Sequence, residues 1–108
     1  MSSKEYQAAW HQANKERRKP KIKARKDAVK ERNRAYLAEL KNVPCRDCGK
    51  IYPPYVMDFD HLADKTCNLS DNRVLFWSIA KIDEEANKCE VVCANCHRQR
   101  TWERLMLH

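Results

Sequence analysis

Two short segments decide how this 108-residue chain folds: CRDCG at residues 45–49 and CANCH at residues 93–97. Each holds two cysteines separated by two residues, a spacing that lets both thiolates of a pair reach one tetrahedral ion at about 2.3 Å. The sequence therefore predicts a structural zinc site formed by Cys45, Cys48, Cys93 and Cys96. A redox dithiol would more often be a single pair beside a βαβ pattern, which is absent here.

The long interval between the two pairs shows what the ion would do for the fold. Residues 49–92 lie between them, so one ion would tie together distant parts of the chain. A module formed by residues 43–108 cannot bury a large core, and metal binding is expected to supply much of its folding free energy. The other two cysteines, Cys67 and Cys89, sit in no paired motif and are expected to be ordinary buried thiols.

Polar residues interrupt an otherwise apolar segment between the cysteine pairs, VMDFDHL at residues 56–62. It places Asp58, Asp60 and His61 in a predicted strand, where unpaired polar groups are costly to bury. His97 follows Cys96 about 100° further round a helix, so it points away from the zinc. Phosphodiester hydrolysis suits such groups: a neutral histidine accepts a proton from water, and a carboxylate with a second histidine holds a divalent cation.

These residues resemble the zinc-containing branch of the HNH endonucleases, which is common in phages and their hosts. The similar pattern is Cys-x-x-Cys-Gly, then Asp-Phe-Asp-His-Leu, then Val-Val-Cys-Ala-Asn-Cys-His-Arg-x-Arg-Thr, over residues 43–101. The resemblance implies a small zinc-stabilised α+β fold, the treble-clef-like ββα-metal module, which grips one divalent ion at the minor groove of DNA. It also implies that His61 is the general base and that Asp60 and His97 hold a catalytic Mg²⁺ or Mn²⁺.

One position departs from the family pattern. The middle asparagine of the family normally lies five residues before the third cysteine, and Lys88 occupies that position here. Lysine cannot orient a base by accepting a proton, although it could contact a phosphate. Asn87 and Asn95 are the two candidates for the orienting role, and the sequence does not choose between them.

Positive charge is concentrated in the first 42 residues. The chain has a formal net charge of +7, and residues 1–42 hold 13 Lys and Arg against 5 Asp and Glu. We expect this segment to be a basic helical arm that contacts DNA phosphates without reading bases, although a solvated charged helix is the other interpretation. The candidate DNA-contacting residues are Arg17, Arg18, Lys19, Lys21, Lys23, Arg25, Lys26, Lys30, Arg32 and Arg34.

The coarse pattern divides the chain into this arm (residues 1–42) and a zinc-bound nuclease domain (residues 43–108). Pro20 should separate two basic helices, 4–19 and 21–41, because its ring removes a donor and disfavours helix at the preceding residue. Only the C-terminal end of the second helix should dock on the module. Two strands are expected, over residues 55–62 and 91–92. A helix over 72–81, capped by Asp71 and followed by a helical turn over 83–88, should contribute Val74, Leu75, Trp77 and Ile79 to the core. The last predicted element is a helix over 94–107, with Trp102, Leu105 and Met106 facing inward.

Taken together, the sequence predicts a metal-dependent DNA endonuclease or nickase that acts on double-stranded DNA as a monomer or weak dimer. No apolar run is long enough to span a bilayer and no secretory signal is recognisable, so we expect a reducing cytoplasm, that of the host if the protein is phage-encoded. The first alternative is a zinc-containing nucleic-acid-binding protein that has lost catalysis. A small structural or ribosome-associated zinc protein is the second.

Overall fold

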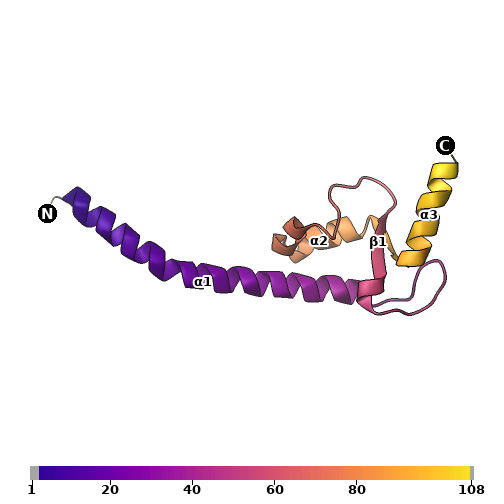
Figure 1. The fold of residues 1–108 in the computed structure, drawn as a ribbon, viewed down its shortest axis with the longest axis horizontal. Helices are drawn as coiled ribbons and strands as arrows, with labels where there is room; N and C mark the ends of the chain where they lie inside the picture. Colours follow the sequence, from indigo (N-terminus) through magenta and orange to yellow (C-terminus); the bar gives the residue numbers. More distant parts are fainter. Residues whose placement is uncertain (1–2, 108) are drawn as a thin grey trace.

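A long helix joined at its C-terminal end to a small α+β module makes up the computed structural model, which has overall extents of 73 × 30 × 20 Å (Figure 1). The structure describes residues 3–107, with side chains for residues 7–9, 12 and 19–107. The elements in chain order are the helix α1 (Ser3–Leu40), the 3-10 turn η1 (Pro54–Val56), the strand β1 (Met57–His61), the 3-10 turn η2 (Asn72–Phe76), the helix α2 (Ile79–Ala86), the strand β2 (Cys89–Cys93) and the helix α3 (Ala94–Met106).

The N-terminal arm is one helix, and the prediction of two helices separated at Pro20 is wrong. Pro20 lies inside α1 and is exposed. A proline within a helix removes one hydrogen bond and crowds the preceding turn, which bends a helix as often as it ends it. The flanking lysine, arginine and alanine residues are good helix formers and carry the helix past this point. The ribbon of α1 is accordingly curved but continuous (Figure 1).

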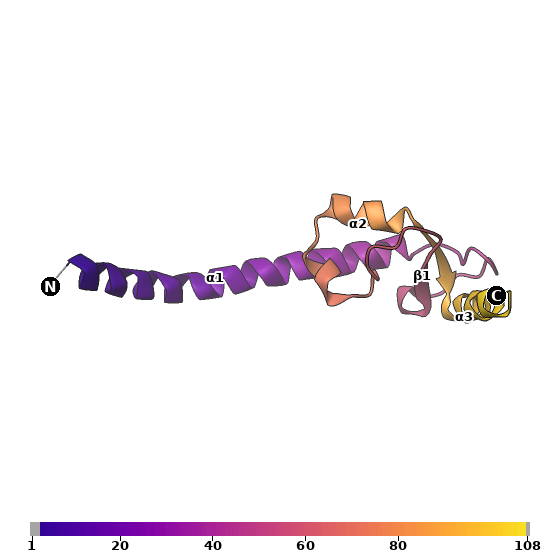
Figure 2. The same ribbon diagram turned by 90° about the horizontal axis from the view of Figure 1, so that it is seen from above.

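The last turns of α1 belong to the core of the module, as expected. Tyr36, Leu37 and Leu40 pack against a buried cluster formed by Cys67, Leu69, Val74 and Ile82. Figure 2 shows this end of α1 running alongside η2 and α2. The predicted boundary between arm and module, at residue 42, therefore lies after the last turns of α1, although these turns pack in the core of the module.

Asn33 makes the most specific contact between α1 and the module. Its side chain is fully buried, and its Nδ2 donates to the carbonyls of Val74, Leu75 and Trp77 at 3.2, 2.9 and 2.9 Å. These carbonyls belong to η2 and to the residue that follows it. The Val74 carbonyl also accepts from the Trp77 N–H, and the Trp77 carbonyl accepts from Arg32 Nη2. Among these contacts, only the Leu75 carbonyl therefore has Asn33 as its single donor.

The sheet has two antiparallel strands, β1 and β2, whose register runs from Met57 opposite Cys93 to His61 opposite Cys89. Met57 packs into a second cluster with Val92 and the buried cysteines, whereas Phe59 packs into the cluster beneath α2. Both strands lie where the sequence predicted them, and β2 is longer than the predicted pair 91–92. The fold class is therefore α+β, and Cys67 is a buried thiol as expected, whereas Cys89 is half-buried.

The predicted helix over 72–81 is two elements, because the chain is extended at Trp77 and Ser78. The Ser78 hydroxyl accepts from the Lys81 N–H at 3.2 Å and starts α2, which continues through most of the predicted 83–88 turn. The predicted cap at Asp71 is confirmed, since its carboxylate accepts from the Arg73 N–H at 2.8 Å. Of the predicted core, Val74 is fully buried, and Trp77 packs against the same cluster, as does Ile79.

The C-terminal half of α3 points away from the module (Figure 1). Trp102, Leu105 and Met106 are 61%, 70% and 65% exposed, so the prediction that they face inward is wrong. The sheet has only two short strands, and α3 extends beyond the surface that they offer. Among the residues that the structure describes, no helix is both long and apolar enough to cross a membrane.

Replacing Asn33 by alanine should weaken the attachment of α1. The variant leaves the carbonyls of Val74, Leu75 and Trp77 without their buried donor, which typically costs about 1–3 kcal/mol. Urea denaturation followed by tryptophan fluorescence would measure the loss. Asn42→Ala, at an exposed position just after α1, is the matched control and should be close to neutral. Equal destabilisation by the two variants would contradict this role of Asn33.

Candidate metal centre and histidine sites

Four cysteines converge at the junction between the segment that follows α1 and the start of α3. The sulfur atoms of Cys45, Cys48, Cys93 and Cys96 all lie within 4.8 Å of one another. Two of them, those of Cys48 and Cys93, are 4.0 Å apart. A tetrahedral ZnS₄ centre with bonds of about 2.3 Å requires sulfurs about 3.8 Å apart. The cluster could therefore hold a structural metal ion such as zinc, as the spacing of the cysteines predicted.

Backbone hydrogen bonds hold the first cysteine pair in a tight loop. The Cys45 N–H donates to the Lys50 carbonyl and the Gly49 N–H donates to the Cys45 carbonyl, both at 2.9 Å. Gly49 has a φ of +71°, a conformation that glycine adopts without strain. The second pair is positioned differently, because Cys93 ends β2 and also caps the N-terminus of α3.

The surroundings prepare one thiol of the cluster for ionisation. Burial opposes ionisation of Cys45, but backbone N–H groups near its sulfur outweigh it and lower its pKa to about 6. One of these donors is the Cys93 N–H, 3.3 Å from the Cys45 sulfur. Hydrogen bonds with Cys93 and the other thiols raise the pKa of Cys96. Metal binding would therefore release protons from this cluster.

A second polar group lies on the face of β1 that is turned towards α3. His97 is held between two carboxylates: its Nδ1 is 3.0 Å from Asp58 Oδ2, and its Nε2 is 3.5 Å from Asp60 Oδ1. Asp60 is 3% exposed, whereas the side chains of His97 and Asp58 are 33% and 44% exposed. The structure thus brings Asp60 and His97 together, as predicted for a pair of metal ligands, and adds Asp58.

Two arginines of α3 also bind Asp60. Arg104 spans both carboxylate oxygens at 2.8 and 2.7 Å, and Arg100 Nη1 lies 2.8 Å from Oδ2. The hydrogen bonds from Arg104, and then those from Arg100, outweigh the effect of burial and lower the pKa of Asp60 to about 2. Arg100 also pairs with Asp47, next to the first cysteine pair. The Asp60 carboxylate is therefore ionised, and both of its oxygens are bound by arginines although the side chain is buried.

His61 points the other way, towards α2, because successive side chains of a strand alternate between its faces. Its Nε2 lies 2.9 Å from Glu85 Oε1, and Glu85 is 3% exposed. Lys88 holds the second oxygen of Glu85 at 3.0 Å and also binds the Asp64 carbonyl and the Thr66 hydroxyl. Lys88 therefore ties the loop that follows β1 to α2.

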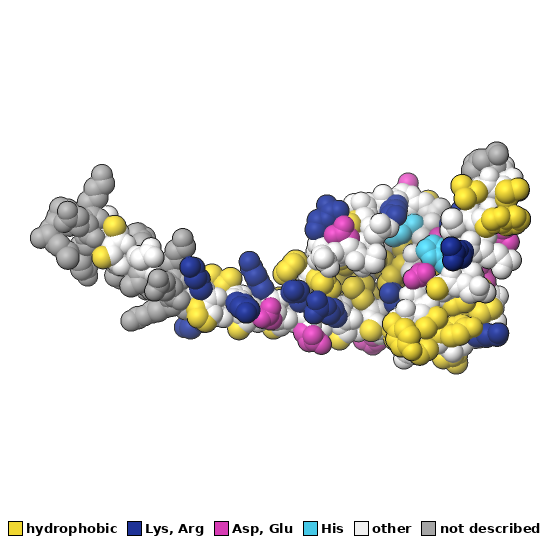
Figure 3. All heavy atoms as spheres, viewed as in Figure 1, with side chains coloured by type: hydrophobic (Ala, Val, Ile, Leu, Met, Phe, Trp, Pro, Cys, Tyr) yellow, Lys and Arg dark blue, Asp and Glu magenta, His cyan; other side chains and the backbone are white. Residues whose placement is uncertain are grey.

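Glu85 is ionised in this setting. Burial alone would favour its neutral form, but the Thr66 N–H, the Lys88 ammonium and His61 outweigh burial and lower its pKa to about 2. Because Glu85 is ionised and can only accept, His61 Nε2 is the donor in their contact. Figure 3 shows the histidine side chains close together in view on one face of the module, among acidic and basic groups.

Other predicted site residues lie elsewhere. Asn87 is the exposed C-cap of α2, and its backbone N–H donates to the Asp83 carbonyl, while Asn95 is exposed in the first turn of α3. The observed hydrogen-bond partner of His61 is Glu85, and neither asparagine takes that position. The lysines and arginines of the arm from Lys19 to Lys30 are exposed or half-buried along α1, and basic side chains line this helix in Figure 3. Arg32 donates to the Trp77 carbonyl at 3.3 Å and Arg34 lines a groove beside η2, whereas the predicted side chains of Arg17 and Arg18 lie outside the described residues.

Sequence reasoning missed four residues of these networks: Asp58 received no role, and Glu85, Arg100 and Arg104 were not assigned. A signal for the arginines exists, because they follow His97 by three and seven residues and so share its helix face. Glu85 has no such signal, since its contact with His61 joins a strand to a helix 24 residues further along the chain. A scan against protein-family models, a search of curated proteins and a search of solved structures each gave no match.

Cys48→Ser should release the metal and lower the stability of the module. We expect one zinc ion per chain in the wild type, measured by inductively coupled plasma mass spectrometry, and a large loss in this variant. Cys89→Ser is the matched control, because its sulfur contacts the Glu85 carbonyl at 3.5 Å and lies outside the cluster. Equal zinc loss in both variants would show that Cys48 is not a ligand.

The buried Glu85 should make stability fall in acid. Its pKa is about 2 in the folded chain against an ordinary value of 4.5, so its contribution is present above pH 4.5 and is lost as the pH falls towards 2. Glu85→Gln should be less stable than wild type at pH 7 and lose less stability between these values. Urea denaturation at each pH measures this, with Glu84→Gln at the exposed neighbouring position as the control. Parallel pH profiles for wild type and Glu85→Gln would exclude the effect.

Proposed function

We propose that this chain is a metal-dependent DNA endonuclease or nickase of the HNH type. The observation that carries the proposal is the arrangement of His97 between Asp58 and Asp60. A metal-ligating histidine nearly always donates its other ring N–H to a carboxylate, which fixes its tautomer. Asp58 is that acceptor for Nδ1, and Nε2 is then free to ligate an ion together with Asp60.

The donor set fits a hard divalent cation. Carboxylate oxygens and one imidazole suit Mg²⁺ or Mn²⁺ better than softer metals, and Asp60 with His97 would hold the ion. When bound, such a cation supplies charge stabilisation for the phosphate and the leaving 3′ oxygen. Arg100 and Arg104 already direct two guanidinium groups at this place, where they would also bind phosphate oxygens.

His61 is the proposed general base. Glu85 accepts the Nε2 proton and leaves Nδ1 to take a proton from the attacking water. The same carboxylate stabilises the imidazolium that forms, as the acidic member of a hydrolytic triad does. Glu85 therefore takes the orienting role for which the family uses asparagine, and Lys88 positions Glu85.

Double-stranded DNA is the proposed substrate because of the basic arm. The lysines and arginines from Lys19 to Arg34 lie along a helix that projects from the module, and a helix of this kind follows phosphates without reading bases (Figure 3). If about six phosphates were contacted, the slope of log affinity against log salt would be near −5.

One observation favours the alternative, a zinc-containing nucleic-acid-binding protein without catalysis. Both oxygens of Asp60 are bound by arginines, and His61 is bound by Glu85. These groups satisfy one another within the protein, so they could be a purely structural network. For catalysis the ion must share Asp60 with Arg100 and Arg104.

Cleavage of supercoiled plasmid separates the two proposals. With Mg²⁺ or Mn²⁺ the wild type should produce nicked or linear DNA, and EDTA should abolish it. His61→Ala should lower the rate by about 10²–10⁴-fold, the usual contribution of a general base. His97→Ala should keep its zinc and fold and lose metal-dependent cleavage.

Three outcomes would each contradict a different part of the proposal. Cleavage that survives His61→Ala would remove the assignment of the base. If neither DNA nor RNA is cut although the divalent metal is bound, the binding protein is the better description. If His97→Ala unfolds as Cys48→Ser does, the separation of a structural centre from a catalytic centre is wrong.

A further inference from the structure

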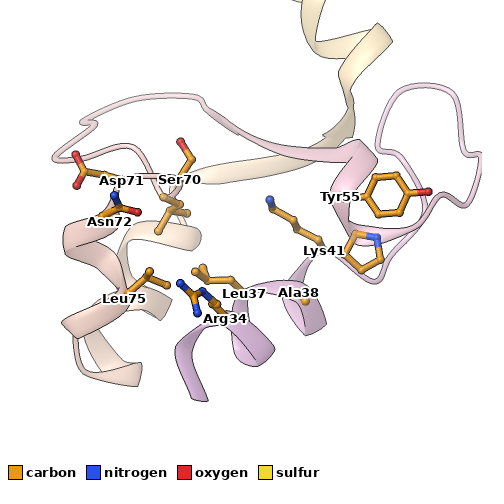
Figure 4. Close-up of a pocket in the computed structure, with 11 residues that line it drawn as sticks. Arg34, Leu37, Ala38, Lys41, Tyr55, Ser70, Asp71, Asn72 and Leu75 are labelled. Atoms are coloured by element: carbon orange, nitrogen blue, oxygen red, sulfur yellow. The ribbon is translucent and has the colours of Figure 1, made fainter. Parts of the chain in front are cut away.

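A groove of about 530 Å³ lies between the C-terminal end of α1, η1 and the loop that leads into η2 (Figure 4). Its volume falls within the range of about 300–1,000 Å³ that is usual for ligand sites. Leu37 and Leu75 give it an apolar floor, and Tyr55 stands at one end. None of the groups discussed so far as a metal ligand or base lines it.

The charged residues of this groove favour an anion. Arg34 and Lys41 both line it, and in Figure 4 the Lys41 ammonium extends into the space between Tyr55 and Ser70. That ammonium also lies 5.3 Å from the centroid of the Phe59 ring. The acidic residue of the lining, Asp71, is already bound by Arg73 through two side-chain contacts of 3.1 Å. The positive charges therefore outweigh the negative one.

Tyr55 is unusual for an aromatic residue in so small a module, because it is 86% exposed. It follows Pro53 and Pro54, and the latter begins η1, so the backbone that carries the ring is stiff. An exposed ring on a stiff backbone beside positive charge is a combination that binds single-stranded nucleic acid, since unpaired bases stack on the ring and phosphates meet the cations.

The groove is continuous with the proposed reaction centre. A neighbouring hollow of about 190 Å³ shares Lys41, Leu69 and Ser70 with it. This second hollow is also lined by Asp58 and His97. Lys41 thus stands between the two spaces, and a strand whose phosphate lay at His97 would have its neighbouring nucleotide directed towards Tyr55.

We propose that this groove binds the DNA strand next to the scissile phosphate, with Lys41 and Arg34 on its phosphates and Tyr55 stacked on a base. The inference rests on the proposed function for the identity of the substrate, and it extends the basic arm, to which Arg34 belongs, by a groove at its C-terminal end. It assigns Lys41 and Tyr55 as substrate-binding residues.

The test measures binding and not cleavage. Full-length protein loaded with zinc is titrated into a fluorescent DNA duplex that carries a single-stranded overhang, without added divalent cation, and anisotropy gives the affinity at several salt concentrations. Tyr55→Ala should weaken binding by about fivefold or more, whereas Tyr55→Phe keeps the ring and should stay within about twofold of wild type. Lys41→Gln should lower the salt slope by about one, and Lys50→Gln, an exposed lysine outside both hollows, should leave it unchanged.

A second measurement locates the contact directly. DNA that carries 5-iododeoxyuridine is photo-crosslinked to the protein, and mass spectrometry identifies the residue. Cross-links to Tyr55 are expected. Wild-type affinity in Tyr55→Ala together with cross-links only on α1 or α3 would overturn the proposal. Zinc content and circular dichroism exclude misfolding of the variants.

The outcomes separate this proposal from the proposed function. Weaker binding by the variants with no cleavage by the wild type would leave the groove assigned and overturn the enzyme. Cleavage by the wild type with unchanged binding and unchanged cross-links in the variants would overturn the groove and leave the enzyme.

Discussion

The convergence of two distant cysteine pairs is the constraint on which the module depends. Cys93 is the last residue of β2, the cap of α3 and a member of the cluster, so whatever holds its sulfur also sets the angle at which the helix leaves the sheet. The loop of Cys45 is held against the same strand, since the Arg46 N–H donates to the Val91 carbonyl at 3.0 Å. Few apolar residues are buried around this junction, and a bound ion would stabilise it far more than such packing can.

Alternation along β1 then divides the polar residues between two networks. Asp60 faces α3 and its arginines, whereas His61 faces α2 and Glu85. The two buried carboxylates are both ionised, because in each case hydrogen-bond donors compensate for the loss of water. Adjacent residues therefore have separate partners.

The long helix joins the module by one end only. Asn33, Tyr36, Leu37 and Leu40 belong to the core, while the residues further towards the N-terminus project from it (Figure 2). The attached end also forms one wall of the groove, and this groove shares Lys41, Leu69 and Ser70 with the hollow that His97 lines. The helix α1 thus leads from a projecting basic surface towards the proposed reaction centre. The buried Asn33 amide fixes the rotation of α1 about its axis, which apolar contacts alone would not do. This rotation determines which side chains of α1 line the groove.

Spacing and alternation, read from the sequence alone, predicted the four cysteines, both strands and the cap at Asp71, and the resemblance to the HNH pattern predicted that Asp60 and His97 lie together. These features depend on residues that are near in sequence or on ligands whose number fixes the geometry. Tertiary structure alone decided that α1 continues past Pro20, that Trp102, Leu105 and Met106 remain exposed, and that Glu85 holds His61. For α1 the reason is that the helix propensity of the flanking residues outweighs the local cost of Pro20. For the exposed side chains of α3 and for Glu85, the outcome depends on which surface is available after distant segments have packed, and no local pattern records that surface.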